Sequence, residues 1–235
     1  MRKKSDKESF WPSYVDIVTT LFAIMVVLFA VSYSRFRVKE VELRKLADKY
    51  EEIKSIYDMV ENIDSSYFEF NKEYVKHIFK IQVKYQTKAF DLRKLEADRY
   101  NRAEADSLRE RIKEAGRVIE STIRQLQESN STRQDIKYLV VIEGQASKVY
   151  FNDGPWMNNN TLSYLRALYL HQFWKDEAGI DFSNMKKCEL VISGSGEEGV
   201  PRDSLDENNQ RFLIHIVPVI GNIRLDETES SVTRK

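Results

Sequence analysis

A single carboxylate lies within an apolar segment that is long enough to span a membrane. Residues 15–33 read VDIVTTLFAIMVVLFAVSY and carry no charge other than that of Asp16. About 20 predominantly apolar residues in one helix cross the hydrocarbon core of a bilayer. A carboxylate at that depth is costly, so Asp16 is by default a candidate functional residue. The fold must therefore combine one membrane helix with the polar remainder of a 235-residue chain.

Charge and cysteine usage exclude several classes of function. The 37 Lys and Arg residues balance the 37 Asp and Glu residues, so nucleic acid is not an expected partner. The single Cys188 excludes an intramolecular disulfide and leaves only one to a second copy of the chain. The three histidines are scattered, without the spacing of a zinc site. We expect no metal, no cofactor and no enzymatic activity.

A cleaved signal peptide is the alternative to a retained membrane helix. Basic residues at positions 2, 3, 4 and 7 and the small residues Ala30-Val31-Ser32 resemble parts of such a peptide. The apolar run is longer than usual, however, and Asp16 interrupts its start, which favours retention. Basic residues also follow the helix, so their distribution does not decide its orientation.

The distribution of turn-forming residues separates the two halves of the chain. All eight glycines lie at or after Gly116, and no proline falls between Pro12 and Pro155. Apolar residues at helical spacing from Val38 to Val60 indicate a stalk, either a solvated helix with weak pairing or a coiled coil. We expect a cytoplasmic tail at 1–11, a transmembrane helix at 12–34, a stalk at 35–64, an α+β domain at 65–223 and a flexible tail at 224–235.

The hydrophobic period changes after Asp64. Residues 77–86 alternate as in a half-buried strand, and residues 67–70 are a candidate partner strand. The pattern then predicts helices at 104–128 and 161–175 and strands at 138–142, 189–193 and 212–217. The order β-α-β-α-β-β predicts an α+β domain, a mixed sheet with its helices on one face.

The apolar segment and its start resemble the membrane helix of MotB-type stator subunits. Tyr14-Val15-Asp16 matches their aromatic-x-Asp motif, and the form Phe-Trp-x-Ser-Tyr-x-Asp is closest to the B subunit of Zorya anti-phage systems. The resemblance implies that Asp16 carries H⁺ or Na⁺, with Tyr14, Thr19 and Thr20 beside the ion path. It also implies a homodimer in the lipid bilayer and a polytopic MotA-like partner that forms a ring.

Asp16 has a second interpretation that needs no ion. Ser13-x-x-Asp16 has the spacing of a capping box, so the carboxylate could lie at the membrane interface and complement the helix dipole.

Hydrocarbon favours the neutral form of a carboxyl group and water the charged form, which is the property an ion carrier needs.

Residues 65–220 resemble the OmpA-like peptidoglycan-binding domain. Four segments match the family in order: Leu139 to Gly144, the N-x-x-L-S-x-x-R-A helix from Asn159 to Ala167, the loop Gly194-Ser195-Gly196-Glu197 with Pro201, and Asn209-Gln210-Arg211. The resemblance implies that Arg166 clamps a carboxylate of the peptidoglycan stem peptide. A planar, bidentate guanidinium suits that task. The alternative is a surface arginine paired with a nearby acid.

The remaining binding residues that this family implies are Asn159, Ser163, Asn209 and Arg211. One departure stands out. The family usually reads Gly-His-Thr-Asp, and its Asp holds the amino group of the ligand, but this chain reads Gly144-Gln145-Ala146-Ser147. Asp153, in the loop that follows, is a candidate substitute.

Together the two resemblances predict a single-pass protein of the bacterial inner membrane, with a cytoplasmic N-terminus and a periplasmic domain bound to peptidoglycan. It would be the B subunit of an ion-driven motor with antiviral function. A flagellar-type stator subunit and a passive cell-wall tether are the alternatives.

Overall fold

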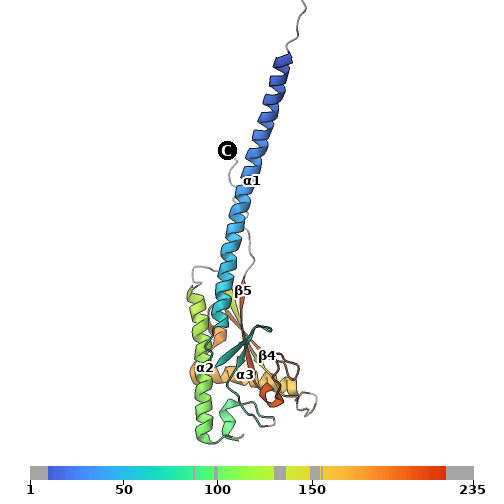
Figure 1. Ribbon diagram of the computed structural model, residues 1–235. Coiled ribbons are helices and arrows are strands. Elements are labelled where there is room, and N and C mark those ends of the chain that lie inside the picture. The colour runs from blue at the N-terminus through green and yellow to red at the C-terminus, as the bar shows by residue number, and fades with distance from the viewer. Residues whose placement is uncertain are drawn as a thin grey trace, which may run out of the picture. The chain divides into compact units, whose positions relative to one another are not determined.

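The structure is a computed structural model that describes residues 10–86, 88–97, 100–129, 136–148, 154 and 156–220. These residues fall into two units, 10–53 and 54–220 (Figure 1). The predicted tails at 1–11 and 224–235 lie almost wholly outside the described residues.

The first unit is part of one long helix, α1 (Phe10–Glu61). By length and composition this helix could cross a membrane. Its apolar side chains are exposed, as at Phe22 and Phe29, so this surface requires an apolar surrounding. No break in α1 marks the predicted change from membrane helix to stalk near residue 34, so that boundary stays a prediction.

The second unit is built on a five-stranded mixed sheet with the strand order β1-β2-β5-β3-β4. Strands β3 and β4 are parallel, and the other neighbours are antiparallel. The strands are β1 (Phe68–Asn71), β2 (Lys76–Phe79), β3 (Ile136–Gly144), β4 (Cys188–Gly194) and β5 (Phe212–Ile220). The remaining elements are α2 (Arg102–Ser129), α3 (Asn159–Ala178) and the 3-10 helices η1 (Leu92–Ala97), η2 (Phe182–Asn184) and η3 (Asp206–Asn209).

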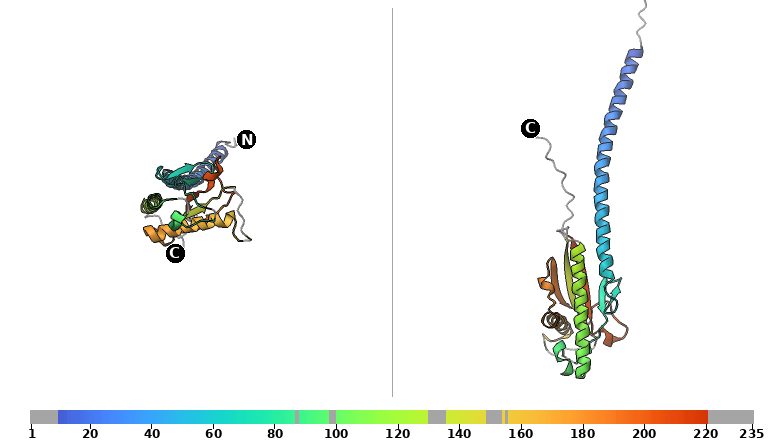
Figure 2. Two further views of the ribbon diagram at one scale, coloured as in Figure 1. Left: turned by 90° about the horizontal axis from the view of Figure 1, so that it is seen from below. Right: turned by 90° about the vertical axis from the view of Figure 1, so that its left-hand side faces the viewer.

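Helices α2 and α3 cover one face of this sheet and cross each other (Figure 2). Tyr138, Val140 and Ile142 alternate along β3 and are buried on that face. The Tyr138 hydroxyl donates to the Leu126 carbonyl at the end of α2 (3.1 Å), which fixes α2 over the sheet. The last turn of α1 also reaches this core, because the Val60 carbonyl contacts His77 Nε2 at 2.7 Å. The predicted single helix followed by an α+β mixed-sheet domain is confirmed.

The partner strand predicted at 67–70 is confirmed as β1, but the strand predicted at 77–86 ends at Phe79. After that residue the backbone finds other partners: Lys80 N donates to Tyr67 O (2.9 Å) and Lys84 N to the Tyr100 hydroxyl (2.7 Å). The side chains still alternate between buried and exposed up to Tyr85. Alternation therefore indicated burial correctly over a stretch that lacks a sheet neighbour.

The core depends on Trp174, which is fully buried and donates from Nε1 to the Ile112 carbonyl at 2.7 Å. We expect Trp174→Ala to lower the free energy of unfolding by about 3–5 kcal/mol, because it leaves a cavity and removes the hydrogen bond to Ile112. Trp156 is 84% exposed, and Trp156→Ala should change the free energy of unfolding by less than about 0.5 kcal/mol. Urea denaturation of the full chain in detergent, followed by circular dichroism, compares the two. Equal effects would contradict this account of the core.

Candidate functional site

The N-terminal turn of α3 lies unusually close to the ends of β3 and β4. Gly144 and Gly194 are paired across these strands. A Cβ atom at Gly144 would lie 2.0 Å from the Ser163 carbonyl oxygen, and one at Gly194 would lie 2.4 Å from Tyr164 N. Only glycine allows the backbones to approach this closely. The two glycines thereby bring the start of α3, and the side chains it carries, to one end of the sheet.

Polar contacts hold this turn in place. The Asn158 side chain caps α3 by accepting from Asn160 N (3.0 Å) and Thr161 N (3.1 Å). The Ser163 hydroxyl donates to Asn160 O (2.8 Å) and accepts from Gly196 N in the glycine-rich loop (3.0 Å). Ser163 therefore connects α3 to that loop and is itself fully buried.

Arg166 emerges one turn later and is only 5% exposed. Its guanidinium lies over the Tyr85 ring, 4.5 Å from the ring centroid, and its Nε donates to the Ala89 carbonyl at 3.1 Å. A cation over an aromatic face is attracted by the ring quadrupole, and the effect increases on desolvation. The segment that precedes α2 therefore fixes the direction of the Arg166 guanidinium with neutral groups.

A pocket of about 250 Å³ opens beside Arg166. It lies between the segment after β2, the segment after β3, the start of α3 and η3. Its described lining is predominantly polar and consists of Gln82, Val83, Lys84, Tyr85, Gln86, Lys88, Ala146, Ser147, Asn159, Leu162, Arg166, Glu207 and Gln210. The volume suits an end group of amino-acid size, because pockets for drug-sized ligands are larger.

The structure brings two of the predicted binding residues, Arg166 and Asn159, to the pocket. The amide Nδ2 of Asn159 donates to Ser147 O at 3.4 Å. Ser163 does not line the pocket and instead supports the turn that carries Arg166. Asp153 lies outside the described residues, so its suggested role as a substitute acid stays a prediction.

Asn209 and Arg211 lie near the pocket without lining it. Asn209 is buried and its Oδ1 accepts from Asp203 N at 2.7 Å. Arg211 donates to Gln145 Oε1 (3.0 Å) and to the Pro201 carbonyl (2.9 Å). Burial lowers the pKa of Arg211. Both residues therefore fix the loop that precedes β5.

Sequence reasoning did not identify two residues of the pocket wall, Tyr85 and Glu207, or the carbonyl of Ala89 that accepts from Arg166. Tyr85 carried a signal, since it closes the alternating pattern that begins at residue 77. Ala89 acts through its carbonyl, which no side-chain pattern could indicate. Glu207 lies two residues before Asn209, but nothing in the sequence placed η3 beside the segment after β2.

A buried charge cluster lies on the sheet face opposite the helices. Glu143 Oε2 accepts from Lys76 Nζ (2.9 Å) and lies 2.8 Å from His215 Nε2. Lys76 also donates to the Val200 carbonyl at 2.8 Å, which connects the cluster to the glycine-rich loop. Burial alone would raise the pKa of Glu143, but hydrogen bonds from His215, Ser195 and Lys76 lower it to about 2.

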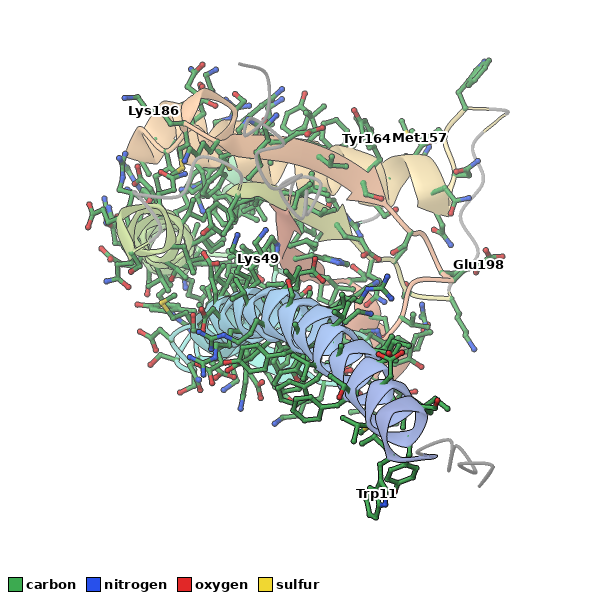
Figure 3. All side chains as sticks on the ribbon, turned by 90° about the horizontal axis from the view of Figure 1, so that it is seen from above. Trp11, Lys49, Met157, Tyr164, Lys186 and Glu198 are labelled. Atoms are coloured by element: carbon green, nitrogen blue, oxygen red, sulfur yellow. The ribbon has the colours of Figure 1, made fainter. Side chains whose placement is uncertain are left out.

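The second candidate site, Asp16, lies on the exposed surface of α1. The Thr19 hydroxyl donates to Val15 O (2.7 Å) and the Thr20 hydroxyl to Asp16 O (2.8 Å), so both hydroxyl protons are used within the helix. Thr19 and Thr20 are three and four residues after Asp16 and share its face. Tyr14 contacts the Trp11 ring edge-on, and Figure 3 shows Trp11 projecting from the helix.

Comparisons with solved structures find several similar chains, and two of them are MotB-like proteins. No family model matches this chain, and a comparison with characterised proteins gives no match. A MotB-like protein from Desulfovibrio vulgaris is 13% identical, with a TM-score of 0.38, over 75% of this chain and 94% of that one. The periplasmic domain of Helicobacter pylori MotB is 12% identical, with a TM-score of 0.35, over 64% of this chain and 87% of that one. Both TM-scores are below 0.5, and neither similarity assigns a function to this chain.

We expect Glu143→Gln to destabilise the domain most at neutral pH. The pKa of Glu143 is lowered from 4.5 to about 2. This shift stabilises the folded domain by about 3 kcal/mol at pH values above 4.5, the pKa in the unfolded chain. That contribution is lost as the pH falls from about 4.5 through about 2, so the difference between wild type and variant should shrink over this range. Urea denaturation at several pH values measures this difference in the free energy of unfolding. Glu189→Gln, at an exposed position of β4, is the control. A pH-independent difference would contradict this role of Glu143.

Proposed function

We propose that this chain is the B subunit of a MotA/MotB-type ion-driven membrane motor. Asp16 carries H⁺ or Na⁺, and the C-terminal domain anchors the motor to peptidoglycan through the pocket at Arg166. The chain crosses the bacterial inner membrane once, with its N-terminus in the cytoplasm and its domain in the periplasm. The form Phe-Trp-x-Ser-Tyr-x-Asp favours a Zorya-like anti-phage system as the setting. The proposal includes no enzymatic reaction.

The observation that carries the proposal is the position of Asp16. It is the one charged residue of an apolar helical segment whose side chains are exposed along its length. A carboxylate in hydrocarbon is unfavourable unless it faces a partner, another polar group or water. One helix cannot line an ion path by itself, which requires a polytopic MotA-like subunit and favours a second copy of this chain.

Residues around Asp16 support an exchange of ions. The side chains on its face toward the C-terminus are small or hydroxylated, at Thr19, Thr20 and Ala23. Because the threonine hydroxyl protons are bonded to helix carbonyls, their oxygens remain as acceptors beside the carboxylate. Such oxygen atoms can accept a hydrogen bond from a water molecule that carries the proton, or they can coordinate a sodium ion.

The anchoring role is supported by the geometry at Arg166. Its guanidinium is held by Tyr85 and Ala89, and it lies on a pocket of amino-acid size. An arginine in a desolvated, fixed position is suited to recognise a carboxylate. A motor of this type needs such a fixed point, because torque requires one element that does not turn.

Two other functions are compatible with parts of this arrangement. A flagellar-type stator subunit would use the same two sites. Neighbouring genes distinguish the two: helicase or nuclease genes indicate a defence system, and flagellar genes indicate a stator. A passive cell-wall tether would use Arg166 alone and would not need Asp16.

Asp16→Asn should abolish function in cells while its membrane level stays normal, because the amide cannot carry an ion. Asp16→Glu should retain part of the activity. Plaque formation on cells that carry the chain with its neighbouring genes measures defence, and swimming measures a flagellar output. Asp48→Asn, in the exposed stalk region of α1, is the matched control. Full activity of Asp16→Asn would refute the motor and leave the tether.

Arg166→Lys should weaken binding to purified peptidoglycan about tenfold, because lysine keeps the charge but loses the planar donor pair and the contact with Tyr85. Arg111→Lys, on the exposed side of α2, should leave binding unchanged. Co-sedimentation of the full chain in detergent with peptidoglycan sacculi compares the two. Equal binding by both variants would remove the support for an anchor at this pocket.

A further inference from the structure

The pocket is lined by residues of both charges, with three cations and one carboxylate among those that the structure describes. Arg166 supplies a buried guanidinium, and Glu207 supplies a carboxylate from an exposed position on η3. The Glu207 carboxylate makes no hydrogen bond or ion pair with any residue that the structure describes. The neighbouring acids Asp203 and Asp206 accept hydrogen bonds within the protein. Glu207 is therefore a pocket carboxylate that remains available to a ligand.

Contacts on both sides fix the short helix that presents Glu207. On one side, Gln82 Nε2 donates to Asn208 Oδ1 at 2.6 Å, which joins η3 to the segment after β2. On the other side, the Asp206 carboxylate accepts from Lys148 N (2.9 and 2.8 Å) and from Arg202 (3.1 Å). The position of Glu207 is therefore set by the same segments that form the pocket wall.

The hydroxyl at position 147 cannot provide a negative charge. Ser147 is buried, and its Oγ accepts from Gln210 Nε2 at 3.2 Å. A cationic group of a ligand would find only neutral oxygen there. Glu207 lines the same pocket and carries the charge that Ser147 lacks.

We propose that Glu207 receives the ammonium group of a ligand whose carboxylate is held by Arg166. The ligand is then the dipolar end of a peptide, with one free amine and at least one carboxylate within a pocket of about 250 Å³. Lys84 and Lys88 also line the pocket, so the preferred peptide is acidic overall. This inference rests on the proposed binding of peptidoglycan and assigns its free-amine contact to η3.

The test uses two soluble stem tripeptides that end in a diamino dicarboxylic acid, one with a free side-chain amine and one with that amine acetylated. Calorimetry with the full chain in detergent should give about tenfold tighter binding of the free-amine peptide, because an ion pair with Glu207 is lost on acetylation. Glu207→Gln should abolish this preference and leave the affinity for the acetylated peptide unchanged.

The matched control is Glu198→Gln. Glu198 is also an exposed acid, and Figure 3 shows it on the glycine-rich loop. It is not among the residues that line the pocket. It should retain the tenfold preference. Asp153→Asn is included because Asp153 is the other candidate acid.

Two results would overturn the assignment and keep the anchoring function: a preference that survives in Glu207→Gln, or one that disappears in Asp153→Asn alone. Wild type that binds both peptides equally, with Arg166→Ala binding neither, would also overturn it. If wild type and Arg166→Ala bind neither peptide, the anchoring function itself fails.

Discussion

The close packing of α3 on the ends of β3 and β4 is the constraint on which the pocket depends. Gly144 and Gly194 leave no side chain between the strands and the helix, and Ser163 joins the helix to the glycine-rich loop. A bulkier residue at either glycine would move the turn that carries Arg166. The pocket is thus a product of backbone proximity, and its functional side chains are placed by residues that have no chemistry of their own.

The two candidate sites solve opposite problems of solvation. Asp16 is a charge on an apolar helix surface, and in a bilayer few groups of the same helix could stabilise it. Arg166 is a buried charge inside the α+β domain, where it contacts a ring face and a carbonyl. An unsatisfied carboxylate suits an ion that binds and leaves, whereas a fixed guanidinium suits a ligand that stays. The two proposed roles, ion exchange at Asp16 and peptide binding at Arg166, would use this difference.

Much of this organisation could be predicted from the sequence, because hydrophobic period reports burial directly. The helices and the central strand at 138–142 follow from local patterns. The choice of Arg166 came from the family resemblance, and the structure places this residue at a pocket. The end of β2 could not be predicted from local patterns, because the length of a strand depends on whether a neighbouring strand is there to pair with it. Contacts through a backbone carbonyl, as at Ala89, and across distant segments, as at Glu207, also leave no trace in local composition. Such contacts are a property of the folded arrangement alone.

The hydrogen bond from Trp174 to Ile112 has a mechanical consequence. A wall peptide held by Arg166 would pull on α3, and α3 is joined to α2 by that bond and by the core around Trp174. Protein interiors are densely packed and transmit strain with little deformation. Force applied at the pocket would then be shared by two crossed helices and the sheet beneath them, rather than carried by one loop.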